Sequence, residues 1–149
     1  MPKAQKNNRL PRNFHKTFKP ERQYINAMLR YAASGQSGTY QEIRDATGIP
    51  TGESSGKVPA ILDYCRGMGL IRLVGVERSS VKKTDLTSFG RIVLLEDPYL
   101  KTSISQWIAH FNLCSPRMGA DVWYHTFFAG MQFLGMTFSR VELEKFLAG

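Results

Sequence analysis

The sequence is poor in cysteine, with only two cysteines among 149 residues, and this excludes a disulfide framework as the basis of its fold. Cys65 and Cys114 lie in stretches of periodic apolar residues, which predicts buried thiols in a reducing compartment, the cytoplasm. No apolar run approaches the roughly 18 residues of a membrane span, and no segment resembles a signal peptide, so we expect no membrane partner. A chain of this length suits one soluble domain, or a small domain with an extension.

Acidic residues are scarce at the start of the chain. Residues 1–30 contain eight Lys or Arg and one Glu, a net charge of +7 out of +8 for the whole sequence, so the remainder is nearly neutral. This composition predicts a basic flexible arm at 1–19 that contacts a polyanion through Arg9, Arg12 and Lys16. A solubilising tail explains the same composition, and both interpretations stay open.

The sequence also lacks a phosphate-binding loop, although GIPTGESSGK at 48–57 has the composition of one. The position five residues before Gly56, where the loop needs a glycine, is Thr51, and Val58 follows Lys57 where a hydroxyl should bind Mg²⁺. We therefore expect no cofactor and interpret the stretch as a turn between two short helices.

Helical spacing of apolar residues appears on both sides of this turn. The stretches 20–33 and 57–66 each place apolar residues at i, i+3, i+4 and i+7, which predicts one helix apiece. Between them, Thr39 and Glu42 have the spacing of a capping box, which predicts a short helix that ends at Gly48.

Two strands and a fourth helix are predicted next. LIRLVGVE at 70–77 and TDLT at 84–87 flank a polar tip, which predicts a hairpin, and SFGRIVLLED at 88–97 predicts a helix capped by Thr87 or Ser88. Three helices, a hairpin and a helix are the order of a winged helix-turn-helix, so the predicted fold class is mainly α with a small β-hairpin.

This fold predicts a nucleic-acid contact surface, because the third helix of a winged helix normally enters the major groove while the hairpin lies on the adjacent backbone. The outward face of that helix and the hairpin tip carry these polar side chains: Lys57, Asp63, Tyr64, Arg66, Arg78, Lys82 and Lys83. Asp63 lies in the middle of the face, and many winged helices bind proteins instead, so a protein-binding or solvated face is the alternative.

Residues 98–149 predict a helical extension to a winged-helix domain at 20–97. Asp97 and Pro98 predict a helix start, and the apolar face of that helix is formed by Ile104, Trp107, Ile108 and Phe111. Residues 122–138 are apolar nearly all round, which predicts a covered helix, and Ser139 with Glu142 predicts another capping box. This apolar surface would pack on the winged helix, meet another chain, or contact a further part of a longer protein.

Catalytic groups are few. The carboxylate pairs that suit a divalent metal are Glu96 with Asp97 and Glu142 with Glu144, beside Lys145, and each has a simpler role as a cap or surface residue. His110 and Cys114 are four residues apart on a helix, but two ligands do not make a zinc site. His125 is expected as a hydrogen-bonded core residue, and His15 has no evident partner. We predict no metal site.

Four stretches together resemble the bacterial family catalogued as domain of unknown function 4007. They are NFHKTF, GTYQEIRDATGIPTGESSGKVPAILDYCRGMGLI, LTSFGRIVLLEDPYLKTSISQWIAHFNL and DVWYHTFF, and the resemblance runs from about Phe14 to the end. Members occur in DNA phosphorothioation gene clusters, and the SspB-type component of the single-strand phosphorothioation defence system is similar to the family. Such a system replaces a non-bridging phosphate oxygen by sulfur and restricts unmodified phage DNA. Family members are about twice this length, so the resemblance implies the N-terminal part of a longer protein.

Three functions follow as hypotheses. The first is a DNA-binding winged-helix module of a bacterial phosphorothioation and antiviral defence system, with duplex or nicked DNA as partner. The second is an interaction module that dimerises, or docks other proteins of that system, through the aromatic C-terminal helices. The third, implied by the resemblance, is a metal-dependent nicking component, for which no catalytic residue can be assigned.

Overall fold

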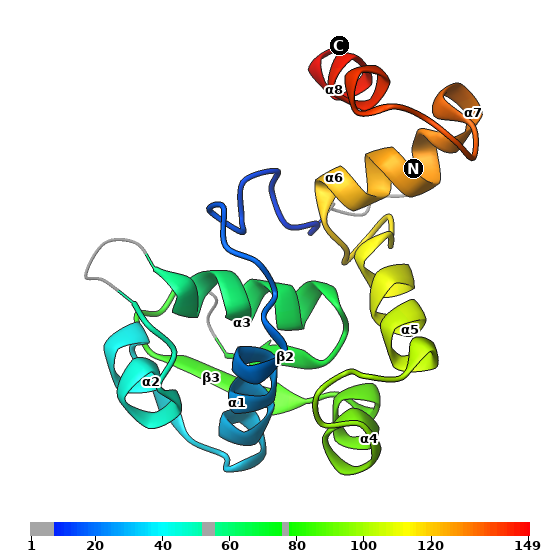
Figure 1. Cartoon of the computed structure of the whole chain (residues 1–149). Coiled ribbons are helices and arrows are strands. Elements are labelled where there is room, and N and C mark those ends of the chain that lie inside the picture. The colour runs from blue at the N-terminus through cyan, green and yellow to red at the C-terminus, as the bar shows by residue number, and fades with distance from the viewer. Residues whose placement is uncertain (1–7, 52–55, 76–77) are drawn as a thin grey trace, which may run out of the picture.

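The computed structural model describes residues 8–51, 56–75 and 78–149, and Figure 1 shows the chain. The described helices and strands are α1 (Arg22–Ala33), β1 (Ser37–Gly38), α2 (Tyr40–Thr47), α3 (Lys57–Gly67), β2 (Ile71–Val74), β3 (Lys82–Leu86), α4 (Ser88–Glu96), α5 (Ser103–Leu113), α6 (Asp121–Trp123), the π-helix η1 (Tyr124–Ala129), α7 (Met131–Leu134) and α8 (Arg140–Ala148). The chain is therefore mainly helical with a small sheet, as predicted. None of the described helices is long and apolar enough to cross a membrane.

The first three helices form where the sequence predicts them. α1 buries its apolar face in the core. At the start of α2, the Thr39 hydroxyl accepts the Glu42 N–H at 3.3 Å and the Glu42 carboxylate accepts the Thr39 N–H at 2.7 Å, so the capping box is complete. Gly48 ends α2 with φ 74°, a left-handed conformation that favours glycine. Residues 52–55 of the predicted turn lie outside the described residues.

The sheet contains three antiparallel strands in the order β1-β3-β2. The predicted hairpin is confirmed, with Ile71 opposite Leu86 and Val74 opposite Lys83. β1 was not predicted, because a pair of small residues carries no alternating pattern. Lys82 and Lys83 lie in β3, where they pair with β1. The prediction that they lie at the hairpin tip is therefore wrong. The register places Arg72 and Lys83 on one face of the sheet, opposite to the face that carries the buried Ile71, Thr84 and Leu86.

Helix α3 lies at the centre of the fold. The segment at 8–19 runs from α6 past α3 to α1 (Figure 1). Leu10 and Phe14 in this segment are 7% and 6% exposed, and Leu10 forms a parallel bridge with Ala120. Leu10 and Phe14 therefore belong to the folded core, while residues 11–13 between them are exposed, so this part of the chain is not the free arm that the composition predicts. Residues 1–7 lie outside the described residues. Every residue of α3 is buried or half-buried.

The connection from α4 to α5 differs from the prediction. Thr87 caps α4 by accepting the Gly90 N–H at 2.9 Å, as expected. Asp97, however, follows the last turn of α4 and does not cap a helix that starts at Pro98, because α5 begins only at Ser103. Its carboxylate instead accepts the N–H groups of Lys101 at 2.8 Å and Thr102 at 3.0 Å, which closes the loop between the two helices.

The C-terminal part is more broken than the sequence suggests. In place of one helix over 122–138, the chain forms α6, η1 and α7, and Gly135 at φ 70° ends the helical stretch. The capping box at Ser139 and Glu142 is confirmed at the start of α8. Figure 1 shows α7 and α8 at the end of the molecule opposite to α2 and the sheet.

Candidate nucleic-acid interface

Tyr64 is not on an outward face of α3, so this expectation is wrong. Its side chain is 4% exposed, and its hydroxyl donates to the carbonyl oxygen of Phe18 at 3.2 Å. The ring meets Phe14 edge-on at a centroid distance of 4.8 Å and Trp123 at 6.3 Å. Burial raises the pKa of Tyr64. Segments remote in sequence therefore cover the helix position from which Tyr64 was expected to reach DNA.

The two basic residues predicted on α3 are held by intramolecular ion pairs. Lys57 lies 2.7 Å from Glu21 and 4.7 Å from the ring centre of Tyr24, and its side chain is 18% exposed. Arg66 contacts Asp63 at 3.2 Å, with each side chain 26% exposed. A carboxylate of the protein itself thus orients each of the two cations.

The basic residues of the N-terminal segment divide into two groups. Arg9 binds Asp121 at 2.9 Å and lies 4.1 Å from the ring centre of Tyr124, so it fixes the segment to the C-terminal helices. Arg12 donates to the carbonyl oxygen of Leu147 at 2.6 Å but remains exposed. Lys16 is exposed, with φ 45°.

A basic surface appears instead on the outer face of the sheet. Arg72 of β2 and Arg91 of α4 are 67% and 65% exposed, and both approach Asp85 of β3, at 2.8 and 3.9 Å. Lys83, two residues before Asp85, is exposed on the same face. We name Arg72, Lys83 and Arg91 the sheet cations. Because they outnumber Asp85, this face carries a positive formal charge.

The remaining hairpin residues complete the basic region. Arg78 is exposed in the connection between β2 and β3. Lys82 points to the other face of the sheet, 6.0 Å from the ring centre of Tyr40. The sequence prediction included Lys83 but missed Arg72 and Arg91. The alternation of β2 and the register of the hairpin would have found Arg72, whereas Arg91 joins the face only through the packing of α4.

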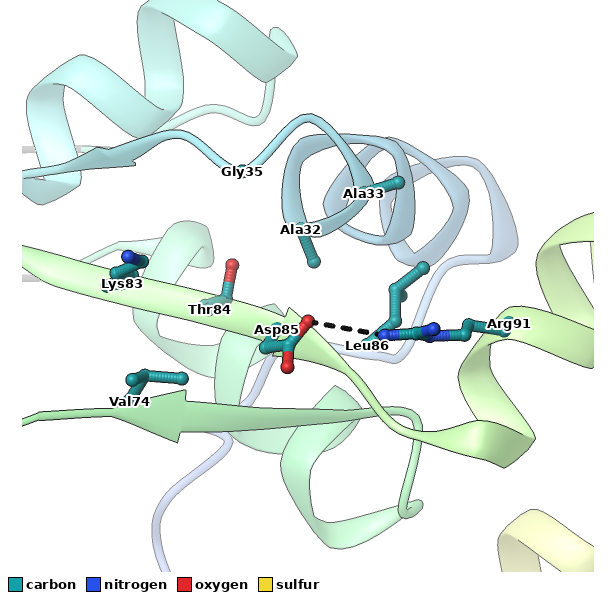
Figure 2. Close-up of a pocket in the computed structure, with 9 residues that line it drawn as sticks. All are labelled: Ala32, Ala33, Gly35, Val74, Lys83, Thr84, Asp85, Leu86 and Arg91. Atoms are coloured by element: carbon teal, nitrogen blue, oxygen red, sulfur yellow. Dashed lines mark ion pairs between the residues drawn. The ribbon is translucent and has the colours of Figure 1, made fainter.

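A pocket of about 510 Å³ lies beside the sheet cations (Figure 2). Its lining is Ala32, Ala33, Gly35, Val74, Lys83, Thr84, Asp85, Leu86 and Arg91. Thr84 is 2% exposed, and its hydroxyl has no hydrogen-bond partner among the described residues. The hydrogen bond from Arg72 and the nearby positive charges of Arg72 and Arg91 hold the pKa of Asp85 below its usual value, against the opposing effect of desolvation. Asp85 therefore stays ionised and orients the two guanidinium groups.

Asp97, Glu142 and Glu144, from the predicted carboxylate pairs, each have a partner within the protein. Burial acts to raise the pKa of Asp97, but hydrogen bonds from Lys101, Thr102 and Ser105 outweigh it and lower the pKa to about 2. Glu142 completes the cap of α8, and Glu144 pairs with Arg140 at 2.6 Å. Within 8–51, 56–75 and 78–149, no three His, Cys, Asp or Glu side chains gather as metal ligands would.

The histidines are placed as follows. His110 Nε2 lies 3.7 Å from Cys114 Sγ, and burial lowers the pKa of His110 and raises that of Cys114. His125 is 38% exposed and 3.5 Å from Asp121, so the expectation of a core histidine is wrong. His15 Nδ1 accepts the N–H of Thr17 at 3.1 Å, a local partner that spacing did not reveal.

These features define a mainly helical domain with a three-stranded antiparallel sheet whose outer face is basic. The sequence matches, over residues 14–149, the family described as "Protein of unknown function (DUF4007)", and the chain belongs to this family. Comparison with curated proteins gives no match. The solved "Magnesium ion-bound SspB crystal structure" is similar in fold, with a TM-score of 0.64 and 22% identity. The match covers 91% of this chain and 40% of the SspB chain, so this chain spans less than half of SspB.

Proposed function

We propose that the chain is a DNA-binding winged-helix module of a bacterial phosphorothioation and phage-defence system, acting in the cytoplasm. The order of α1 to α3 and the β2–β3 hairpin supports the winged-helix assignment. Family membership and the fold likeness to SspB support the defence context. Other proteins of such a system would be its partners.

The observation that carries DNA binding is the group of sheet cations. Exposed guanidinium and ammonium groups attract phosphates and release counterions, which gives affinity that does not depend on base sequence. Because α3 is covered by the segment at 8–19, we assign the contact to the hairpin and the start of α4. This differs from the usual winged-helix arrangement, in which the third helix enters the major groove.

The test is binding of a fluorescent DNA duplex over a series of salt concentrations. We expect K83E/R91E to weaken binding by about tenfold or more at low salt and to reduce the salt slope by about two, since two phosphate contacts are lost. R140E/K145E makes the same change in charge on α8, at the far end of the molecule, and should have a much smaller effect. Y64F should bind DNA as the wild type does, because Tyr64 is buried.

Two results would contradict the proposal. Absence of duplex binding by the wild-type chain at low salt would remove the function itself. An equal loss of affinity in K83E/R91E and R140E/K145E would show that only net charge matters and that the sheet face is no specific surface.

A second candidate function is protein interaction, favoured by an exposed apolar surface. The predicted apolar face of α5 does not pack on the core: Ile104, Trp107 and Phe111 are 70%, 60% and 69% exposed. Phe127 and Phe128 of η1 extend this surface, at 42% and 57% exposed. Apolar patches of this kind commonly mark contact sites. This candidate predicts self-association, or docking of another protein of the system, through these side chains.

A further inference from the structure

A second cavity lies at the free edge of the sheet. β2 is an outer strand, since the order is β1-β3-β2, and a cavity of about 440 Å³ opens along its unpaired side. Its described lining comes from the N-terminal segment, the end of α3, β2 and the loop before α6, and consists of Asn8, Arg9, Leu10, Arg66, Ile71, Arg72, Leu73, Gly75 and Met118. Four parts of the chain that are distant in sequence therefore build one recess.

Three of these lining residues are arginines, and each is oriented by a carboxylate outside the described lining. Arg9 Nε contacts Asp121 at 2.9 Å, Arg66 Nη1 contacts Asp63 at 3.2 Å and Arg72 Nη2 contacts Asp85 at 2.8 Å; we name Arg9, Arg66 and Arg72 the cavity arginines. A guanidinium group has five N–H donors in a planar fork, so pairing with a carboxylate oxygen restricts its motion while the fork can hold more than one acceptor. Arg9 already holds a second acceptor, since its Nη1 donates to the carbonyl oxygen of Pro116 at 2.7 Å. Side chains held in this way lose little entropy when an anion binds.

The walls of the cavity suit an organic phosphate better than a bare anion. Leu10 and Ile71 contribute apolar atoms to the lining although they are only 7% and 2% exposed, and Met118, 65% exposed, contributes a more accessible apolar side chain. The volume falls within the range of about 300–1,000 Å³ of ligand pockets and is larger than a single phosphate needs. Phosphate oxygens would meet the guanidinium groups while the attached carbon skeleton meets the apolar wall.

We propose that this cavity binds the terminal phosphate monoester of a DNA strand. The inference rests on the proposed DNA-binding function and adds recognition of strand ends, as found at a nick or a break. A terminal monoester carries a charge of about −1.5 to −2 at pH 7, more than a backbone diester, and can engage several guanidinium groups at once. A strand end can enter a recess at a sheet edge, whereas a continuous backbone would pass outside it along the sheet cations.

The test compares short duplexes that differ only in their ends: 5′-phosphate, 3′-phosphate, or hydroxyl at both ends. We expect the wild-type chain to bind one of the phosphorylated duplexes about tenfold more tightly than the hydroxyl duplex, as multiple charge-assisted hydrogen bonds imply. R66Q should reduce this ratio to near one while its affinity for the hydroxyl duplex stays close to the wild-type value. K83E/R91E should weaken binding of all duplexes by a similar factor and keep the ratio.

Competition by inorganic phosphate tests the inference on the wild-type chain, without the R66Q variant. The phosphate should compete with the phosphorylated duplex at concentrations that leave the hydroxyl duplex bound, and the preference should fall as the pH drops below about 6, where the monoester gains a proton. Equal affinity of the wild-type chain for all three duplexes would overturn the inference and leave DNA binding intact. If no duplex binds, the proposed function itself fails.

Discussion

At the scale of single residues, Asp97 shows how a carboxylate that resembles a catalytic group can be fully used by the fold. It is 8% exposed and accepts three hydrogen bonds, from the N–H groups of Lys101 and Thr102 and from the Thr102 hydroxyl. The same Thr102 hydroxyl lies 3.0 Å from the hydroxyl of Ser105. A buried ion is stable only when its acceptor positions are filled in this manner. The carboxylate therefore joins α4 to α5.

This role predicts that D97A destabilises the protein, in a manner that depends on pH. We expect the free energy of unfolding at pH 7 to fall by about 1–3 kcal/mol, because buried N–H donors lose their acceptor. The pKa of Asp97 is lowered from 3.8 to about 2 in the folded state, so its contribution is complete above pH 3.8 and is lost as the pH falls toward 2. Urea unfolding of wild type and variant at several pH values measures the difference.

The control for this prediction is D45A. Asp45 is 67% exposed and, within the part of the chain that the structure describes, pairs with the neighbouring Arg44 at 2.9 Å, so its removal should change stability by less than about 0.5 kcal/mol. A D97A variant as stable as D45A at pH 7 would show that the loop does not depend on this carboxylate.

Residue roles that depend on local spacing could be predicted from the sequence, and roles that depend on remote packing could not. Thr39, Thr87 and Ser139 cap helices as expected, because each partner lies three residues away. Tyr64 was assigned to an open surface, because nothing near it in sequence shows that the segment at 8–19 covers it. Arg91 was missed for the same reason, since only the packing of α4 brings it beside Asp85.

At the scale of secondary-structure elements, the contact between α4 and the turn before β2 depends on a glycine. A Cβ atom on Gly90 would lie 1.9 Å from the carbonyl oxygen of Leu70, which is backbone and cannot rotate away. The same carbonyl accepts the N–H of Thr87 at 3.1 Å, so the first turn of α4 sits directly on the end of the α3–β2 connection. Close approach of two backbones therefore requires glycine here.

We expect G90A to destabilise the protein although the substitution favours helix formation. In an exposed helix, replacing Gly by Ala stabilises by about 0.8–1 kcal/mol. At Gly90 the clash with Leu70 should outweigh this gain and lower the free energy of unfolding by about 1–3 kcal/mol, the usual cost of overpacking. Thermal unfolding of G90A beside S88A, an exposed change in the same turn, measures the effect. A melting temperature of G90A at or above that of wild type would contradict the close packing.

The elements themselves were predicted with uneven success. Helical periodicity placed α1 and α3 correctly and indicated α5, although α5 begins at Ser103 and not at Pro98, because one apolar face is enough to indicate a helix. The same pattern said nothing about what the face contacts, and for α5 it marks the exposed side, while Ala109 and Leu113 are buried. The breaks within residues 122–138 could not be predicted, because an apolar stretch without periodicity does not reveal where α6, η1 and α7 meet.

At the scale of the whole molecule, the surface has a basic part and an apolar part. The sheet cations lie beside α1 and α4, whereas the exposed apolar side chains lie on α5 and η1. The Trp107 ring lies 5.8 Å from His110, and His110 lies 4.8 Å from Phe127, so aromatic contacts join α5 to η1. We interpret the two parts as separate surfaces, one for phosphates and one for protein, which allows each to be altered without the other.

This separation predicts the behaviour of W107S/F111S. Because both side chains are largely exposed in the monomer, their loss should leave the melting temperature nearly unchanged, whereas L113A, in the core at 4% exposed, should cost about 2–5 kcal/mol. Light scattering after size exclusion should show a larger mass for the wild-type chain at high protein concentration and a monomer for W107S/F111S. DNA affinity of W107S/F111S should match that of the wild type, because the sheet cations are intact.

A wild-type chain that stays monomeric at all concentrations would exclude self-association through α5. A large fall in the melting temperature of W107S/F111S would show that these side chains belong to the monomer's own core.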